Sequence, residues 1–327
     1  MKKIISINLF IIIIIILFLE IVSNKFKLSN LMGIKSGLIY IKDGSHFLYP
    51  NTAGLIFNEK VFTDKFSFRV PRINFKYDEN NKGIFILGDS VAFGNGVKEQ
   101  DTFIGLLRSK FKYLNFYNNS VPGYQLKDHV RNINTVKDFK NVNKIIYILT
   151  LNDIYETSNV ITINDGIQNK TKFNEGAFSL RNNKILLKLN FYLRDKSYLY
   201  MLIKGLGTDP SKRWFLNVLD QYKKQNFDSF RKDIEKMKMI SKKIETKFYV
   251  IILPYEFQTR NCSNEILFPQ NNIIKILDNL DVKFEDLTKY FCKQIKPKEL
   301  FYKFDPMHLS KEGHMLVYNL IYDKIKF

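Results

Sequence analysis

The stretch GIFILGDSVAFGNGV, residues 83–97, joins a short apolar run to a turn rich in glycine. The run GIFIL has the length and content of a buried β-strand. Gly-Asp-Ser follows at the point where that strand would end, and Gly94 and Gly96 would let the chain turn sharply afterwards. This arrangement predicts that the hydroxyl of Ser90 lies at one edge of a sheet.

Further apolar runs along the chain alternate with helical patterns, and this alternation predicts an α/β fold. Apolar strands separated by helices indicate a parallel sheet that is covered by helices on both faces. The expected strands after the first are LNFYN, 144–151, 247–254 and the weaker 282–288, and the expected helices are 101–111, 125–139, 211–245 and 310–325. The long connection at about 156–245 predicts a helical insertion, either a cap or a pair of extra covering helices.

Polar residues follow three of these strands and precede the last helix. Gly123 comes after the second strand, Asn152 after the third, and Asp305 and His308 before the closing helix. Open parallel sheets bind their ligands beyond the carboxyl ends of the strands. We therefore expect these side chains to meet Ser90 at one edge of the sheet.

Each of these residue types fits one role in acyl transfer. A serine hydroxyl is a weak nucleophile that needs a base, which His308 can supply, and Asp305 can fix the imidazole in one tautomer. The tetrahedral intermediate needs donors aimed at its oxyanion. The backbone N–H groups of Ser90 and Gly123 and the side-chain amide of Asn152 are three candidate donors.

Four blocks, GDSVAFGNGV, NNSVPGY, LTLND and DPMHLSKEGH, resemble in order the four signature blocks of the SGNH (GDSL) hydrolase superfamily. The resemblance covers about 83–320. It implies a flavodoxin-like three-layer α/β/α sandwich, a Ser90–His308–Asp305 triad, and an oxyanion hole of Ser90, Gly123 and Asn152. The third block departs from the usual Gly-x-Asn-Asp, because Thr150 stands in place of glycine. The stretch TDKFSFRV also resembles, more weakly, the lead-in of membrane-anchored members.

The amino terminus predicts a transmembrane helix. Ile4 to Val22 is apolar except at a few positions. At ~1.5 Å per residue, a helix of this length nearly matches a bilayer core of ~30 Å. We interpret 1–27 as a signal anchor, with a cleaved signal peptide as the alternative. The region 28–82 is expected to form extended segments packed on the hydrolase domain, 83–327. We expect a single-pass protein of a bacterial inner membrane, with its catalytic domain on the extracytoplasmic side.

The charge balance is strongly basic, with 51 Lys and Arg against 32 Asp and Glu, a formal net charge of +19. The lysines are scattered without an arginine-rich stripe, so no nucleic-acid partner is expected. Cys262 and Cys292 have no metal-ligand spacing, and the sequence leaves their pairing open. No cofactor and no metal are expected. A structural role is expected for the other histidines: His46, His129 on a helix surface, and His314 on the closing helix.

These observations predict a membrane-anchored serine esterase that removes or transfers O-acyl groups, in particular O-acetyl groups, on cell-surface carbohydrate. Two alternatives remain open at this stage. One is a lipid esterase or lysophospholipase, whose acyl pocket the aromatic-rich insertion could form. The other is a non-catalytic carbohydrate-binding relative, against which the intact Ser90, Asp305 and His308 count. Neither the oligomeric state nor the acyl acceptor follows from the sequence.

Overall fold

The computed structural model describes residues 2–33, 37–42, 45–154 and 184–325. Its core is a sheet of five parallel strands with the spatial order β10-β9-β8-β6-β7. Read from β7 and numbered along the chain, this order is 2-1-3-4-5, the flavodoxin-like arrangement. The predicted α/β class and sheet type are therefore confirmed. The strands are β6 (Lys82–Gly88), β7 (Leu114–Ser120), β8 (Val142–Leu149), β9 (Lys247–Ile252) and β10 (Lys283–Asp286).

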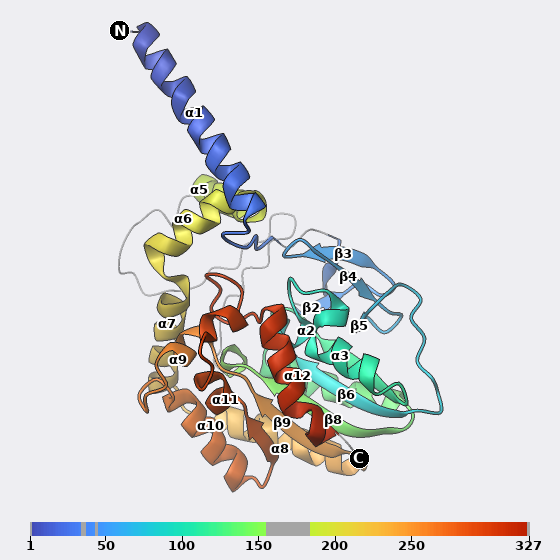
Figure 1. Ribbon diagram of the computed structural model, residues 1–327. Coiled ribbons are helices and arrows are strands. Elements are labelled where there is room, and N and C mark those ends of the chain that lie inside the picture. Colours follow the sequence, from blue (N-terminus) through green and yellow to red (C-terminus); the bar gives the residue numbers. More distant parts are fainter. Residues whose placement is uncertain (1, 34–36, 43–44, 155–183, 326–327) are drawn as a thin grey trace.

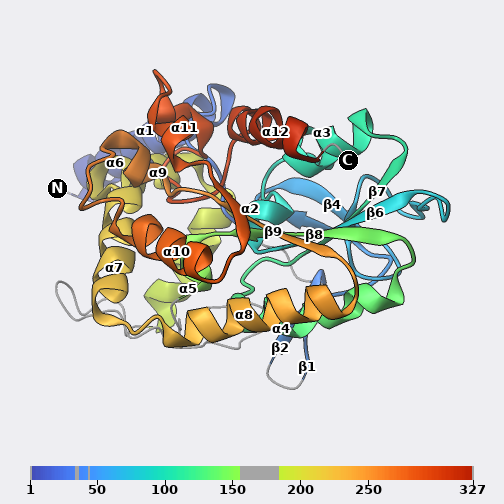
Figure 2. The same ribbon diagram turned by 90° about the horizontal axis from the view of Figure 1, so that it is seen from below.

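Helices cover both faces of this sheet, which explains why its strands are apolar along most of their length. Figure 2 shows α3 (Phe103–Lys110) and α12 (Lys311–Ile325) on one face, and α4 (Leu126–Asn132) and α8 (Asp228–Lys243) on the other. The central strand β6 is buried from Gly83 to Gly88. The layers therefore form the predicted three-layer sandwich.

Shorter elements connect these layers, and one of their junctions carries a disulfide. Cys262, just after α9, is bonded to Cys292 at the end of α11, with a Cα–Cα distance of 6.2 Å. The pairing that the sequence left open is thus made. The connecting elements are α2 (Ser90–Phe93), α9 (Glu256–Arg260), α10 (Phe268–Asn279) and α11 (Thr288–Cys292), with 3-10 turns at Glu99–Asp101, Ile133–Asp138, Leu151–Asp153 and Pro297–Leu300.

The lead-in forms two small antiparallel sheets beside the main one (Figure 1). One is the hairpin of β1 (Ile39–Lys42) and β2 (Ser45–Leu48). The other contains β3 (Ala53–Ile56), β4 (Glu59–Thr63) and β5 (Arg69–Val70). Phe57 and Asn58 form the turn between β3 and β4, with φ values of 50° and 62°. Both residues therefore have the positive φ of a tight hairpin turn.

The connection between β8 and β9 contains α5 (Lys184–Lys196), α6 (Tyr198–Thr208), α7 (Pro210–Lys224) and α8. Residues 156–183 of the predicted insertion lie outside the described residues. Gly205 of α6 lies so close to the ring of Phe304 that a Cβ at Gly205 would be 2.2 Å from it. The hydroxyl of Ser211 in α7 donates to the carbonyl of Asp305 at 3.1 Å. The insertion helices thus pack on the loop that precedes α12.

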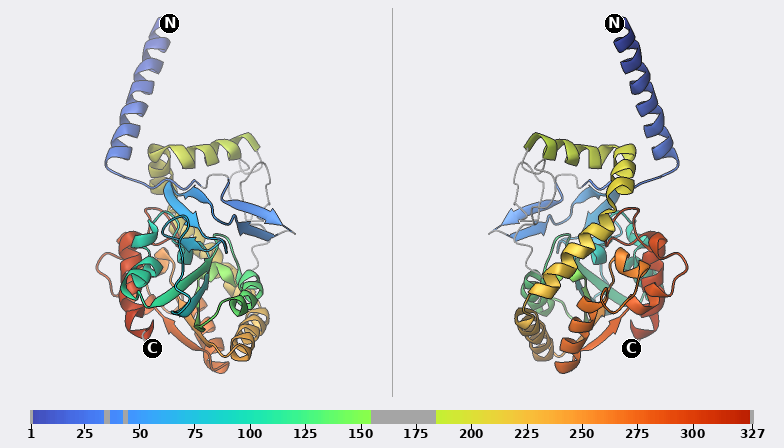
Figure 3. Two further views of the ribbon diagram at one scale, coloured as in Figure 1. Left: turned by 90° about the vertical axis from the view of Figure 1, so that its right-hand side faces the viewer. Right: turned by 90° about the vertical axis from the view of Figure 1, so that its left-hand side faces the viewer.

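The amino-terminal helix α1 (Lys2–Lys25) projects from the rest of the molecule (Figure 3). Residues Lys3–Lys25 are long and apolar enough to cross a membrane, with a mean hydropathy of 3.0. The expected apolar helix is therefore present. At its end the backbone stays ordered: Leu28 N donates to Ser23 O at 3.0 Å, and the side chain of Ser29 donates to Tyr198 O at 2.6 Å.

Candidate active site

Ser90 lies directly beyond the carboxyl end of the central strand β6. Asp89 caps the short helix α2, because its Oδ1 accepts a hydrogen bond from Val91 N at 2.8 Å. Gly94 ends that helix with a φ of 85°, and Gly96 follows with a φ of 78°. The two glycines thus occur where the backbone needs a positive φ, and the sharp turn that the sequence predicted is present.

Ser90, His308 and Asp305 form a continuous chain of hydrogen-bonded side chains. Ser90 Oγ lies 2.8 Å from His308 Nε2, and His308 Nδ1 lies 2.8 Å from Asp305 Oδ2. The other carboxylate oxygen of Asp305 accepts from the backbone N–H groups of Met307 at 2.9 Å and His308 at 2.7 Å. Asp305 is therefore fixed on both of its oxygens, and its 2.8 Å bond orients the imidazole.

Asp305 and His308 shift each other's pKa values, because their charges are opposite. Burial acts to lower the pKa of His308, but the negative charge of Asp305 and its hydrogen bond outweigh burial and raise that pKa above 6.5. Burial acts to raise the pKa of Asp305, but the charge of His308 and the hydrogen bonds from His308 and Met307 lower it. An ionised carboxylate can only accept, so His308 Nδ1 carries hydrogen and Nε2 accepts from Ser90.

The turn that contains Gly123 lies next to the serine. Val121 N donates to Gly88 O at 3.0 Å, which ties the exit of β7 to the exit of β6. Tyr124 N donates to Val121 O at 3.1 Å, and Gly123 has a φ of 85°. A Pro-Gly pair in these positions is typical of a type II turn, whose third residue requires positive φ. His46 Nε2, 2.8 Å from Pro122 O, fixes this turn from the lead-in.

Asn152 lies in the same group and its amide has three polar neighbours. Nδ2 donates to Asp89 Oδ2 at 2.9 Å, while Oδ1 accepts from Tyr255 Oη at 2.8 Å. Thr150 Oγ1 lies 3.0 Å from Asp89 Oδ2 and 3.0 Å from Asn152 Oδ1. An amide nitrogen carries two hydrogens, and the bond to Asp89 uses one of them. The five sequence-predicted site residues thus gather at the carboxyl edge of the sheet.

Three neighbours of the site were missed by sequence reasoning. The ring of Phe57, at the tip of the β3–β4 hairpin, meets that of His308 edge-on with centroids 5.0 Å apart. Tyr255 follows β9 and binds Asn152, and its place after an apolar strand was a usable signal. Arg69 is fully buried and donates to the carbonyls of Phe93, Gly94 and Val97, so it fixes the turn after Ser90. Its only signal was the stretch TDKFSFRV.

The remaining histidines lie outside this hydrogen-bonded chain. His314 of α12 is buried and stacked on Phe103, with ring centroids 5.5 Å apart. The prediction that His129 faces a helix surface is wrong, because its side chain is fully buried against Tyr147. Burial lowers the pKa of His129 to about 3 and keeps it neutral. The apolar side of the short helix α4, rather than its exposed side, carries this residue.

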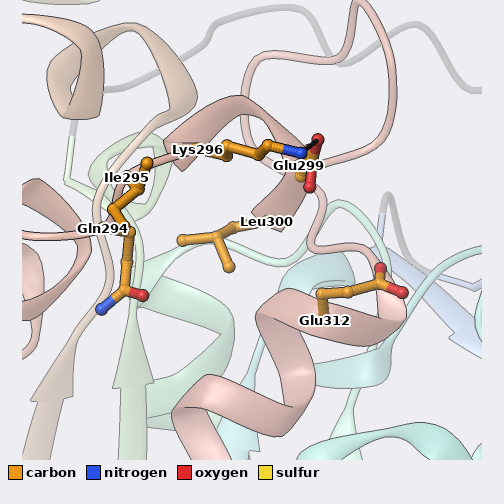
Figure 4. A pocket seen from close by; sticks show the side chains of 6 residues that line it. All are labelled: Gln294, Ile295, Lys296, Glu299, Leu300 and Glu312. Carbon is orange, nitrogen blue, oxygen red and sulfur yellow. Dashed lines mark ion pairs between the residues drawn. The ribbon is translucent and has the colours of Figure 1, made fainter.

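Two other features bear on ligands. Among the described residues, no group of three or more His, Cys, Asp or Glu side chains is placed to hold a metal ion. A hollow of about 320 Å³ lies near the end of α11, and Lys296 and Glu299 form an ion pair of 3.0 Å on one side of it (Figure 4). No residue of the Ser90–His308–Asp305 chain lines this hollow, and we assign it no role. Its lining consists of Gln294, Ile295, Lys296, Glu299, Leu300 and Glu312.

Comparison with known proteins gives matches among solved structures. No family model and no curated protein matches the sequence. The structure matches a lipolytic protein of the G-D-S-L family from Veillonella parvula, with 11% identity, a TM-score of 0.44, and coverage of 75% of this chain and 98% of that one. It also matches the acetyl xylan esterase AlAXEase, with 14% identity, a TM-score of 0.44, and coverage of 75% and 100%.

A further match is the psychrotrophic esterase EstA from Pseudoalteromonas sp., with 13% identity, a TM-score of 0.39, and coverage of 75% of this chain and 97% of that chain. Many lipolytic proteins of this kind match over a similar share of the chain. The sheet order 2-1-3-4-5 is the flavodoxin-like arrangement that the four sequence blocks predicted. At these identities and TM-scores the similarity says nothing of substrate or activity.

Proposed function

We propose that this chain is a membrane-anchored serine esterase that removes or transfers O-acyl groups, in particular O-acetyl groups, on cell-surface carbohydrate. The observation that carries this proposal is the unbroken chain from Ser90 Oγ through His308 to Asp305, with both contacts at 2.8 Å. A nucleophile bonded to a base, and a base oriented by a third group, is the arrangement that covalent acyl transfer requires.

In the proposed first step, His308 Nε2 takes the proton of Ser90 while Oγ bonds to the acyl carbon. The negative charge moves onto the carbonyl oxygen, where the N–H groups of Ser90 and Gly123 and the free amide hydrogen of Asn152 would stabilise it. Collapse of this intermediate breaks the ester C–O bond, and the leaving sugar oxygen takes the proton from His308 and becomes a hydroxyl. The products are an acyl-serine and a free alcohol.

In the second step an acceptor hydroxyl attacks the acyl-serine, and His308 again takes its proton. The bond between the acyl carbon and Ser90 Oγ then breaks, and Oγ takes that proton back from His308. Attack by water releases a carboxylic acid, whereas attack by a sugar hydroxyl transfers the acyl group. Asp305 stays ionised throughout and stabilises the imidazolium in both steps. The proposed mechanism uses only side chains and backbone N–H groups of this protein.

Two features support a retained anchor with the domain on the extracytoplasmic side. Glu20 of α1 accepts hydrogen bonds from Ser197 and from the first turn of α6, a set of contacts that a cleaved leader would not need to make. The Cys262–Cys292 bridge fits an oxidising compartment, because cytosolic thiols are kept reduced. Such a location would give the enzyme access to acylated polymers of the cell surface.

A lipid esterase remains the second candidate, because α6 lies between the apolar helix α1 and the loop of the site. Glu20 of α1 binds the first turn of α6, and Gly205 of α6 contacts Phe304 in that loop. The site would therefore lie close to the lipids around α1. Activity on esters of increasing acyl length separates the two candidates. A carbohydrate O-acetyl esterase should prefer p-nitrophenyl acetate, whereas a lipid esterase should prefer the octanoyl or longer ester. The full-length chain in detergent micelles is suitable for this assay.

The central test is Ser90→Ala in the full chain. We expect it to abolish hydrolysis of p-nitrophenyl acetate and covalent labelling by a fluorophosphonate probe, because both need the same oxygen. Ser109→Ala is the control: Ser109 is exposed on α3, outside the Ser90–His308–Asp305 chain, and this variant should leave both readouts intact. Full activity and labelling in folded Ser90→Ala would reject the proposal.

A further inference from the structure

The outer sides of α5 and α6 carry large apolar side chains that face solvent. Leu189 and Tyr192 of α5 are 49% and 63% exposed, and Ile203 and Leu206 of α6 are 63% and 72% exposed. Each pair has a spacing of three residues, so its members lie on one side of their helix. Apolar side chains gathered on an exposed surface indicate an interaction site rather than a solvated surface. We call these four residues the outer apolar face.

Lysines flank this face on α5. Lys188 and Lys196 are exposed, and Lys196 follows Tyr192 by four residues, on the same side of the helix. A lysine can lay its apolar stem along such a face while its ammonium group remains in the polar layer. An apolar face bordered by lysines is typical of helices that lie in the interface of a phospholipid bilayer.

The corner between α5 and α6 is bonded to the end of the apolar helix α1. Glu20 of α1 lies 2.6 Å from Ser197 Oγ, 2.8 Å from Tyr198 N and 3.1 Å from Leu199 N. Lys27, just after α1, also donates to Tyr198 Oη at 3.1 Å. Glu20 lies only five residues before the end of α1, so these contacts place the corner at the depth where the apolar helix would leave the bilayer.

The orientation of α5 agrees with this depth. Both views of Figure 3 show α5 lying across the direction of α1, next to the end of α1 that meets the domain. With α1 across a bilayer, α5 would therefore lie along its surface rather than point away from it. The single acidic residue of α1, Glu20, is satisfied by the same corner, which explains how the carboxylate is tolerated near the apolar span.

We propose that the outer apolar face inserts into the interface of the phospholipid bilayer that α1 spans, so that the domain lies on the membrane surface. This inference rests on the proposed retention of α1 as an anchor, but not on the proposed chemistry. Because Gly205 of α6 packs against Phe304, next to Asp305, the lipid-bound helix pair would also support the loop of the proposed triad.

The test measures the depth of single labels in the full chain, reconstituted into vesicles of phosphatidylcholine and phosphatidylglycerol. The two native cysteines are bonded to each other, so a new cysteine is the one free thiol. Tyr192→Cys and Leu206→Cys carry an environment-sensitive fluorophore, and vesicles are made with and without nitroxide-bearing lipids. Intact mass of the reconstituted protein shows whether α1 is retained.

We expect both labels to emit at shorter wavelength in vesicles, and their emission to fall by roughly half with nitroxide lipids, since interfacial helices enter the headgroup boundary by ~5–10 Å. Tyr113→Cys is the matched control, because Tyr113 is 61% exposed and packs near Phe111, which stacks on Tyr322 at the end of α12 far from α1 (Figure 1). Its label should respond to neither condition.

Two results would overturn the inference. Labels at Tyr192 and Leu206 that behave like the Tyr113 label would show that the face stays in water. A shift to shorter wavelength without nitroxide quenching would show that protein, such as a second copy of this chain, covers the face. Loss of α1 in the mass spectrum would instead reject the anchor itself. Esterase activity is measured separately by the Ser90→Ala assay, so failure of the proposed chemistry is distinguishable.

Discussion

At the scale of single residues, the Asp305–His308 pair of the proposed triad predicts how hydrolysis would depend on pH. His308 can accept the serine proton only when it is neutral, and its pKa is raised above 6.5. The rate of hydrolysis should therefore fall as pH decreases through the pKa of His308, which lies above 6.5, and should reach its maximum at higher pH. Steady-state rates on p-nitrophenyl acetate between pH 5 and 9 measure this midpoint.

Asp305→Asn should move that midpoint to lower pH, because burial of His308 would then act without the opposing carboxylate. The turnover number should also fall, by up to ~10⁴-fold, since the amide no longer selects the productive tautomer. Circular dichroism of the variant checks that it is folded. A folded Asp305→Asn protein with the wild-type midpoint would show that Asp305 does not act on His308.

Thr150, which stands where the resembled SGNH block has glycine, contacts Asn152, the proposed oxyanion donor. Its hydroxyl lies 3.0 Å from both Asp89 Oδ2 and Asn152 Oδ1 and so helps to position the Asn152 amide. Thr150→Val should lower kcat about ten-fold, or ~1.4 kcal/mol of barrier, with little change in KM. Thr150→Ser, which keeps the hydroxyl, should retain the wild-type kcat. Equal kcat values for the two variants would leave Thr150 a packing residue only.

At the scale of elements, the lead-in sheets hold the turn that follows Ser90. Arg69 of β5 donates to the carbonyls of Phe93, Gly94 and Val97. Gly94 O would keep its bond from Val97 N, but Arg69→Met would remove the Arg69 donor from the buried carbonyls of Phe93 and Val97. At ~1–3 kcal/mol for each, we expect the free energy of unfolding to fall by ~2 kcal/mol or more. Urea denaturation of the full chain in micelles measures it. Arg72 is exposed, so Arg72→Met should leave the free energy of unfolding unchanged. Equal free energies of unfolding for the two variants would contradict the role of Arg69.

The elements also show which parts of the site a sequence can reveal. Ser90, Gly123 and Asn152 were predictable because each follows an apolar strand, and parallel strands end at one edge. Phe57 was not predictable, since its contact with His308 joins residues far apart in the chain and depends on a tight hairpin turn. His129 was misplaced because α4 is too short for its burial pattern to be read. Glu20 gave no sign of its partner, which lies in a distant helix.

At the scale of the whole molecule, the disulfide reports on the compartment in which the chain folds. The bond joins residues separated by 30 positions, so its removal in a Cys262→Ser/Cys292→Ser double variant should lower the free energy of unfolding by ~2–4 kcal/mol. Thermal unfolding with and without a reductant measures this. The double variant should be indifferent to the reductant, whereas the wild type should lose stability. Two alkylatable thiols in protein isolated under non-reducing conditions would contradict extracytoplasmic folding.

The hydrogen-bonded connection between α1 and the domain has a consequence for which substrates the proposed enzyme can reach. Ser29 is fully buried and Leu31 nearly so, and the hydrogen bonds of Ser29 and Glu20 leave little slack in the connection. A domain on a long, flexible linker can move through a volume whose radius increases with the length of the linker. With α1 retained in a bilayer, this domain would instead stay within a layer one molecule thick, and Ser90, the proposed nucleophile, would stay at a constant distance from the membrane surface. Polymers or lipids would be processed only where they enter that layer. The fold itself would therefore set how far from the membrane a substrate can be.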